Sequence, residues 1–195
     1  LLFIVALFFL KGNAMKTTKH LTFLSFLSLC IMPNTATANN YGSYSPQYSP
    51  NGKYVAYHKN SESTVWDIFV QNVQTGETEN ITNNEAYDTG ASWSPDSKKL
   101  VFSSSRTGQR ELYIYDLSNK KTELLFESPA MENQAQWSPT GGEILFLSRR
   151  TGKSQLFLYD FKTQKQTQLT DTEHHVFHPS WSSTGQSIIF DQHIK

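Results

Sequence analysis

The chain has 195 residues, with 17 basic and 17 acidic side chains in balance and a single cysteine, Cys30. The sequence has no basic run, so it lacks the charge pattern of a nucleic-acid-binding protein. One cysteine excludes both a disulfide scaffold and a metal centre built from cysteine ligands.

The N-terminal part of the chain predicts an export signal. Residues 1–14 precede the first methionine, Met15, and are interpreted as an upstream segment outside the native protein. Residues 15–38 contain the three parts of a secretory signal peptide, namely Lys16 and Lys19, the apolar run Leu21–Met32, and Ala36-Thr37-Ala38. We therefore expect cleavage after Ala38, removal of Cys30 with the signal, and a periplasmic or secreted protein.

Two membrane segments, Leu1–Leu10 and Leu21–Met32, are the alternative interpretation of this region. The second run is shorter than the about 20 apolar residues that cross a bilayer, so no membrane span is expected in the mature chain. Lipid attachment at Cys30 is disfavoured, because Leu29 stands where a small residue is required. Loss of residues 1–38 removes three lysines and leaves 14 basic and 17 acidic residues, a net charge of −3.

Four stretches of the remaining chain resemble one another. They are Tyr48–Tyr57, Trp93–Phe102, Trp137–Phe146 and Trp181–Phe190, and their first residues are 45, 44 and 44 positions apart. Repetition at this period is typical of a β-propeller, with one four-stranded blade in each repeat. Residues 39–195 are therefore predicted to form a partial propeller, a fragment with three blades and part of a fourth.

Each repeat predicts four antiparallel strands, with complete blades near residues 44–84, 89–128 and 133–170. The second strand carries three consecutive apolar residues, as in Leu100-Val101-Phe102, which indicates burial on both faces. No segment has a helical apolar period, so the fold class is all-β. Because the fourth blade is unfinished, Ile188 is expected to lack contacts that Ile144 makes in the third.

These motifs resemble the repeat of the TolB-like β-propeller family, a WD40-like repeat. The matching segments are Trp93-Ser94-Pro95-Asp96, Ser104-Ser105-Arg106-Thr107-Gly108, Leu112-Tyr113-Ile114-Tyr115-Asp116 and Leu169-Thr170. The resemblance covers residues 44–190 and implies the fold, whereas propellers carry many unrelated functions. TolB itself has an α/β domain between its signal peptide and its propeller, so this chain is interpreted as a TolB-like protein other than TolB.

Three histidines are the candidate metal ligands: His174, His175 and His178. They precede the first strand of the fourth repeat, a connection that faces the channel mouth in propellers, and imidazole is a common metal ligand. The resemblance also implies distant lyase relatives that use a metal. The column of His178 contains Gly90 and Gln134 in other repeats, which argues against a ring of ligands. The sequence therefore predicts no metal and no cofactor.

The other polar motifs do not predict catalysis. Ser103-Ser104-Ser105 and Ser182-Ser183 lack the Gly-x-Ser-x-Gly pattern of a nucleophile elbow, so no catalytic residue is predicted. Among the acids of the repeat, Asp96, Asp116, Asp160 and Asp191, we expect the middle two to cap turns.

Three tryptophans share one column of the repeat: Trp93, Trp137 and Trp181. They are interpreted as core between blades rather than as a stacking surface for sugars or bases. Trp66 lies outside the column, and a single tryptophan does not predict a binding site.

Two classes of function follow. The first is an exported, non-enzymatic propeller that serves as a binding platform for a protein or peptide, or for a polysaccharide. The second is a larger enzyme with its chemistry outside these residues. The propeller would then gate substrate for a prolyl-oligopeptidase-type serine peptidase, or belong to a metal-dependent polysaccharide lyase. Sequence beyond Lys195 would discriminate between them.

Overall fold

The structure is a computed structural model that describes residues 2–9, 43–60 and 65–194. The predicted signal peptide and its cleavage site at Ala38 lie outside the described residues. The described residues form strands and turns without any helix, which confirms the all-β class. Within this part of the chain, therefore, no helix is long and apolar enough to cross a membrane.

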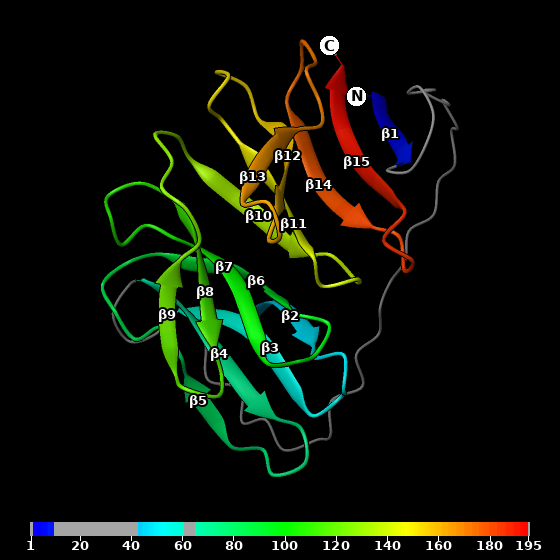
Figure 1. Ribbon diagram of the computed structural model, residues 1–195. Helices are drawn as coiled ribbons and strands as arrows, with labels where there is room; N and C mark the ends of the chain where they lie inside the picture. The colour runs from blue at the N-terminus through cyan, green and yellow to red at the C-terminus, as the bar shows by residue number, and fades with distance from the viewer. Residues whose placement is uncertain (1, 10–42, 61–64, 195) are drawn as a thin grey trace.

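Three complete four-stranded antiparallel sheets form blades 1 to 3. Blade 1 contains β2 (Ser43–Tyr48), β3 (Tyr54–Asn60), β4 (Trp66–Asn72) and β5 (Thr78–Asn80). Blade 2 contains β6 (Asp88–Trp93), β7 (Lys99–Ser104), β8 (Glu111–Asp116) and β9 (Lys121–Leu124). Blade 3 contains β10 (Glu132–Trp137), β11 (Glu143–Ser148), β12 (Gln155–Asp160) and β13 (Lys165–Gln168). The blades follow one another around an arc, with the first strand of each towards its inner side (Figure 1).

The last strand of each blade ends directly before an apolar residue of the repeat. The apolar residue after it still donates its backbone N–H to the third strand, as Leu125 does to the carbonyl of Leu112 at 2.8 Å. The antiparallel ladder therefore continues by one hydrogen bond beyond the last strand of each blade.

The fourth sheet contains β14 (Val176–Trp181) and β15 (Ser187–Ile194), as expected from the repeat, together with β1 (Leu2–Phe9). Strand β1 pairs antiparallel with β15, from Leu2 opposite Ile194 to Phe9 opposite Ser187. It takes the position that the third strand takes in blades 1 to 3 (Figure 1). The sequence did not predict this pairing, because an uninterrupted apolar run does not specify a strand partner.

A bulge occurs at the same place in each first strand. The register shifts between Tyr44 and Gln47 in β2, and at the equivalent positions of β6, β10 and β14. The bulge contains one residue with positive φ, namely Ser45 at 50°, Gly90 at 69°, Gln134 at 49° and His178 at 45°. The repeat column that includes His178 is therefore defined by the bulged backbone rather than by a side chain, which explains why the residue type differs between repeats.

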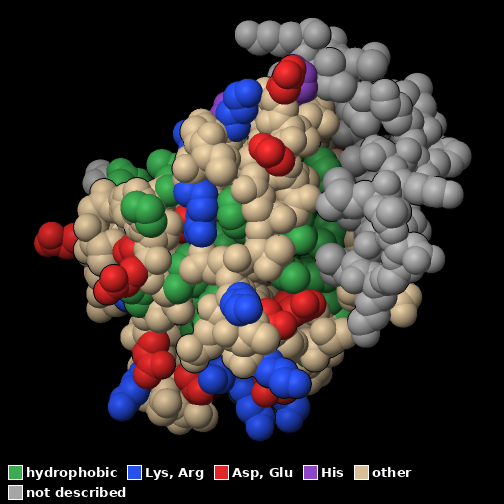
Figure 2. All heavy atoms as spheres, turned by 45° about the horizontal axis from the view of Figure 1, so that its top comes forward, with side chains coloured by type: hydrophobic (Ala, Val, Ile, Leu, Met, Phe, Trp, Pro, Cys, Tyr) green, Lys and Arg blue, Asp and Glu red, His purple; other side chains and the backbone are tan. Residues whose placement is uncertain are grey.

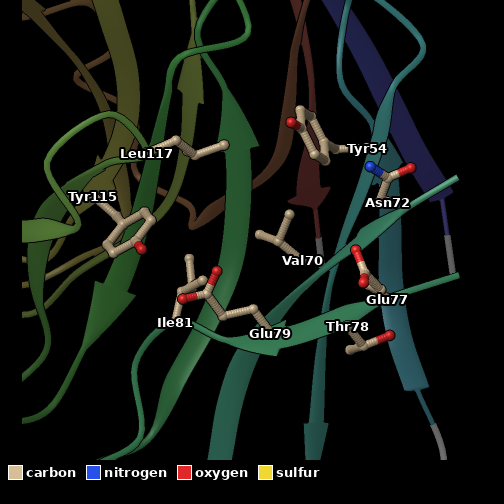
Figure 3. Close-up of a pocket in the computed structure, with 9 residues that line it drawn as sticks. All are labelled: Tyr54, Val70, Asn72, Glu77, Thr78, Glu79, Ile81, Tyr115 and Leu117. Atoms are coloured by element: carbon tan, nitrogen blue, oxygen red, sulfur yellow. The ribbon is translucent and has the colours of Figure 1, made fainter. Parts of the chain in front are cut away.

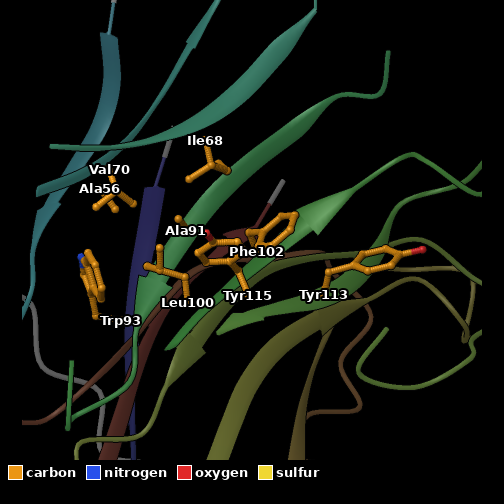
Figure 4. Packing of buried hydrophobic residues seen from close by; sticks show 9 residues of the cluster. All are labelled: Ala56, Ile68, Val70, Ala91, Trp93, Leu100, Phe102, Tyr113 and Tyr115. Carbon is orange, nitrogen blue, oxygen red and sulfur yellow. The ribbon is translucent and has the colours of Figure 1, made fainter. Parts of the chain in front are cut away.

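The core lies between blades, because successive residues of the second strands face opposite neighbours. Leu100 and Phe102 pack against Ala56 and Ile68 of blade 1 (Figure 4). Val101, between them in sequence, packs with Ile144 of blade 3. This alternation follows from the two-residue period of a strand and makes each second strand part of two cores.

The expectation for Ile188 is wrong for the same reason. Ile188 is fully buried against Leu145 and Leu147 of blade 3, just as Ile144 is buried against blade 2. The residue that faces away from blade 3 is Ile189, which is 42% exposed. Successive residues of β15 therefore face opposite sides, so that Ile188 and Phe190 face blade 3 and Ile189 faces away from it.

Candidate functional site

Two hairpins on one edge of the blades are built around buried ion pairs. We call this edge, with the β7–β8 and β11–β12 hairpins, the hairpin edge. In blade 2, Nη2 of Arg106 lies 3.3 Å from Oδ1 of Asp88, whose side chain is fully buried. The Arg106 Nε donates to Ser104 Oγ at 2.8 Å, and the guanidinium carbon lies 4.4 Å from the ring centre of Tyr113. Charge, hydrogen bonds and cation–π contact together fix this hairpin.

Blade 3 repeats this arrangement. Nη2 of Arg150 lies 3.0 Å from Oε1 of the fully buried Glu132, and its Nε donates to Ser148 Oγ at 2.8 Å. The guanidinium carbon lies 4.6 Å from the ring centre of Phe157. The sequence analysis missed these pairs, although each acid precedes its arginine by 18 residues in both repeats.

Other cations of the two hairpins remain outside the ion pairs of the described residues. They are Arg110, Arg149 and Lys153. Arg149 and Lys153 are exposed at the tip of the β11–β12 hairpin, directly beside the anchored Arg150. Figure 2 shows acidic and basic side chains interspersed over the face that it presents, so neither sign dominates there.

Three serines of the serine-rich runs, Ser104, Ser105 and Ser182, have structural partners. Ser104 Oγ accepts from Arg106, and Ser105 Oγ accepts the backbone N–H of Tyr87 at 2.9 Å. Ser182 Oγ accepts the backbone N–H of Ser187 at 3.1 Å and thereby closes a turn. These hydroxyls stabilise hairpins and connections, as expected for strand and turn serines.

The structure does not bring the three candidate histidines into one cluster. His175 Nδ1 accepts the backbone N–H of Ser154 at 2.9 Å, and His178 Nδ1 lies 2.9 Å from Oδ2 of Asp191. His174 contributes its backbone carbonyl, which accepts from Gln155 Nε2 at 3.1 Å. Among the described residues, no group of three His, Cys, Asp or Glu side chains is placed to hold a metal ion.

Asp116 and Asp160 cap turns, as their spacing predicts. Asp116 Oδ1 accepts from the hydroxyl and the backbone N–H of Ser118, at 2.6 and 2.9 Å. Asp160 Oδ1 accepts the backbone N–H of Thr163 at 2.8 Å. These hydrogen bonds favour the ionised carboxylates and lower the pKa of both groups below the usual aspartate value.

The tryptophan column lies between blades, but its members are not equivalent. Trp93 is buried in the core between blades 1 and 2, and its Nε1–H donates to the carbonyl of Gln47 at 3.1 Å. Trp181 donates in the same way to Gln136 of blade 3 at 3.4 Å. Trp137 donates instead to Gly141 of its own blade at 3.2 Å.

Blade 1 has an aromatic cluster that the sequence analysis did not identify. His58 lies opposite Tyr44 in the β2–β3 pair, and their ring centres are 5.9 Å apart. The indole of Trp66 meets both rings edge-on, at 5.0 and 5.4 Å. Burial lowers the pKa of His58, so the neutral imidazole is favoured. The register of the strands brings these side chains together, and the position of Trp66 in the sequence does not by itself predict this.

A hollow of about 320 Å³ opens between blades 1 and 2. Figure 3 shows Tyr54 and Tyr115 on opposite sides of it, with Val70 between them. Glu79 also lines the hollow and accepts from Lys120 Nζ at 2.7 Å, which links blade 1 to blade 2. Burial, followed by the charge of Glu79, raises the pKa of Tyr115. The hollow is therefore lined by phenol and carboxylate groups beside apolar side chains, a combination suited to binding a small polar ligand group.

Repeated four-stranded blades with their cores between neighbouring sheets define this protein as a β-propeller. The sequence matches the family described as the TolB β-propeller domain over residues 31–195, and the chain belongs to that family.

Three solved structures show the extent of the similarity. TolB from Acinetobacter baumannii is 30% identical, with a TM-score of 0.68 over 75% of this chain and 37% of its own length. A putative TolB from Agrobacterium tumefaciens is 17% identical, with a TM-score of 0.66 over 98% of this chain and 78% of its own. A puromycin-hydrolyzing peptidase from Mycobacterium tuberculosis is 17% identical, with a TM-score of 0.59 over 69% of this chain and 23% of its own. The chain thus spans little more than a third of the first of these proteins.

Proposed function

We propose that this chain is the binding propeller of an exported, non-enzymatic TolB-like protein. Its ligand is a protein or peptide, or alternatively a polysaccharide, and the hairpin edge makes the contact. The observation that supports this most directly is the repeated ion pair beneath the hairpins. Arg106 with Asp88 and Arg150 with Glu132 hold the hairpins in place while neighbouring side chains remain exposed. Loops held on a rigid scaffold are suited to recognition, because little conformational entropy is lost on binding.

Photo-crosslinking in living cells tests the contact surface. A photoreactive residue is placed at Lys153 on the hairpin edge or at Thr167, which is exposed in the last strand, β13, of the same blade. We expect a defined protein adduct from position 153 and none from position 167. Equal adducts from both positions would contradict a specific surface. Absence of adducts, with retention on an immobilised envelope polysaccharide, would identify the alternative ligand.

Export is tested separately by N-terminal sequencing of the full-length protein recovered from the producing cell. We expect the mature protein to begin at Asn39. Recovery of a protein that keeps residues 15–38 in the membrane fraction would contradict cleavage.

The similarity to the propeller of a peptidase supports one second candidate, a substrate gate in front of a hydrolase domain. A fluorophosphonate probe, which labels activated serines, distinguishes the two functions in the full-length protein. A binding platform stays unlabelled, whereas a serine hydrolase is labelled.

A further inference from the structure

The interface between blades 2 and 3 differs from the interfaces on either side of it. At those two interfaces an indole N–H crosses to the preceding blade, from Trp93 to Gln47 and from Trp181 to Gln136. Trp137 donates within its own blade, to Gly141. One of the three interfaces therefore lacks the cross-blade indole hydrogen bond.

Trp137 also differs from Trp93 in its stacking partner. Trp93 stacks on Tyr54 of blade 1, with ring centres 6.1 Å apart. The position equivalent to Tyr54 in blade 2 is Lys99, which cannot stack in the same way. Trp137 stacks instead on Phe161 of its own blade, with ring centres 5.4 Å apart and planes inclined by 19°.

This arrangement leaves a pocket of about 430 Å³ between blades 2 and 3. Trp137, Phe161, Ile114 and Pro95 supply its apolar surface, and Asp96 and Lys99 supply its charges. Two of these residues, Trp137 and Phe161, are aromatic and have nearly parallel ring planes, so they suit a planar group that can stack on them.

The charge around the pocket favours a cation. Lys99 Nζ lies 3.5 Å from Oδ2 of Asp116, which balances the lysine, so Asp96 is the remaining charge of the pocket lining. Lys98, whose charge also acts on Asp96, lies outside the lining. Asp96 Oδ1 accepts from Ser94 Oγ at 2.6 Å and from the backbone N–H of Lys98 at 3.1 Å. The Ser94 hydrogen bond lowers the pKa of Asp96 and keeps it ionised. Its side chain is exposed and can accept further donors.

We propose that this pocket binds the guanidinium group of an arginine presented by a protein or peptide partner. The inference rests on the proposed binding function and adds a second contact, at the edge of the blades opposite the hairpin edge. A guanidinium is planar, stacks on aromatic rings, and donates hydrogen bonds to a carboxylate in a fixed geometry. It therefore matches both the Trp137–Phe161 surface and the Asp96 carboxylate. A neutral sugar could use the aromatic surface but would not require the charge of Asp96.

The probe is Nα-acetyl-arginine methylamide, titrated into the full-length protein labelled with nitrogen-15 at its tryptophan indoles. The chain has four tryptophans, and a Trp137→Phe variant assigns the relevant signal. We expect a saturable shift of the Trp137 signal, with affinity in the millimolar range. The citrulline counterpart, which has the same shape without charge, should cause no saturable shift. Asp96→Asn should weaken binding about tenfold, because it removes a charge-assisted hydrogen bond.

Asp171→Asn is the control, because Asp171 is an exposed carboxylate that does not line this pocket, so the affinity for the arginine probe should be unchanged. The inference is overturned by an absent or non-saturable shift, by equal shifts with arginine and citrulline, or by unchanged affinity in Asp96→Asn. The probe contains no partner protein, so this result is independent of the crosslinking at Lys153. A failed titration with intact crosslinks would reject the arginine pocket and keep the binding platform.

Discussion

Arg149 and Arg150 are adjacent in sequence but differ in environment. Arg150 neutralises the fully buried Glu132, whereas Arg149 is exposed and outside the ion pairs of the described residues. Removal of one partner from a buried pair leaves an uncompensated charge, which is far more costly than loss of a surface charge.

Arg150→Met should therefore lower the free energy of unfolding by roughly 2–4 kcal/mol, since the arginine itself is partly exposed. Arg149→Met should change it by less than about 0.5 kcal/mol. Denaturant unfolding of the two variants and the wild type measures the difference. Equal values for both variants would show that the Glu132 pair does not stabilise the hairpin.

His58 makes the stability of blade 1 depend on pH. Burial lowers its folded-state pKa, so the unfolded chain binds the proton more readily. The stabilisation is present above the unfolded pKa of about 6.5 and is lost as the pH falls through the lower folded pKa.

His58→Phe keeps a ring against Tyr44 and Trp66 but does not titrate. We expect its free energy of unfolding to fall less than that of the wild type when the pH decreases from about 7 to about 5. Denaturant unfolding at the two pH values provides the test, with His174→Gln as a control that should behave like the wild type. A His58→Phe protein with the full wild-type dependence would contradict the assignment.

At the scale of the strand, alternation decides which side chains stabilise an interface. Ile144 and Ile188 both face the preceding blade and are fully buried, whereas Ile189 faces the other way. An isoleucine therefore contributes differently to the free energy of unfolding at adjacent positions of β15.

Ile144→Ala and Ile188→Ala should each cost roughly 2–5 kcal/mol, as expected for a fully buried isoleucine. Ile189→Ala, at a position that is 42% exposed, should cost clearly less. Chemical denaturation of the three variants tests this order. A smaller cost at Ile188 than at Ile189 would mean that the fourth sheet packs on blade 3 through its opposite face.

At the scale of the whole molecule, neighbouring blades also contact one another through the turns between their first and second strands. The backbone N–H of Asn51 donates to Ser97 Oγ of blade 2 at 3.0 Å. At Gly185, an added Cβ would lie 3.2 Å from Cγ2 of Thr140 in blade 3. The turns of consecutive repeats therefore pack closely, although they are far apart in sequence.

Gly185→Ala should destabilise the protein by about 1–2 kcal/mol, because it strains a residue at φ +69° and crowds blade 3. Gly142→Ala is the matched control, since an added Cβ there meets nothing within 4 Å and no positive φ is required. Thermal unfolding compares the two. An unchanged midpoint for Gly185→Ala would indicate that the turns do not constrain the stacking of the blades.

The candidate site was predictable only in part. The turn caps of Asp116 and Asp160 follow from local spacing, because a short carboxylate reaches backbone N–H groups two or three residues ahead. The pairing of Arg106 with Asp88 joins residues 18 positions apart and depends on how β6 and β7 meet. The histidines at 174, 175 and 178 are close in sequence but form separate contacts, because a bulge and a connection direct them apart.

The sequence alone determined the blades, their strands and their turns, because hydrophobic period and turn chemistry act over a few residues and recur with each repeat. Only the tertiary structure decided which face of β15 is covered, which acid pairs with each arginine, and how Trp137 is oriented. Each of these depends on a neighbour in another strand or blade. Trp137 has the same repeat position as Trp93, yet it stacks on Phe161 of its own blade, whereas Trp93 stacks on Tyr54 of the preceding blade.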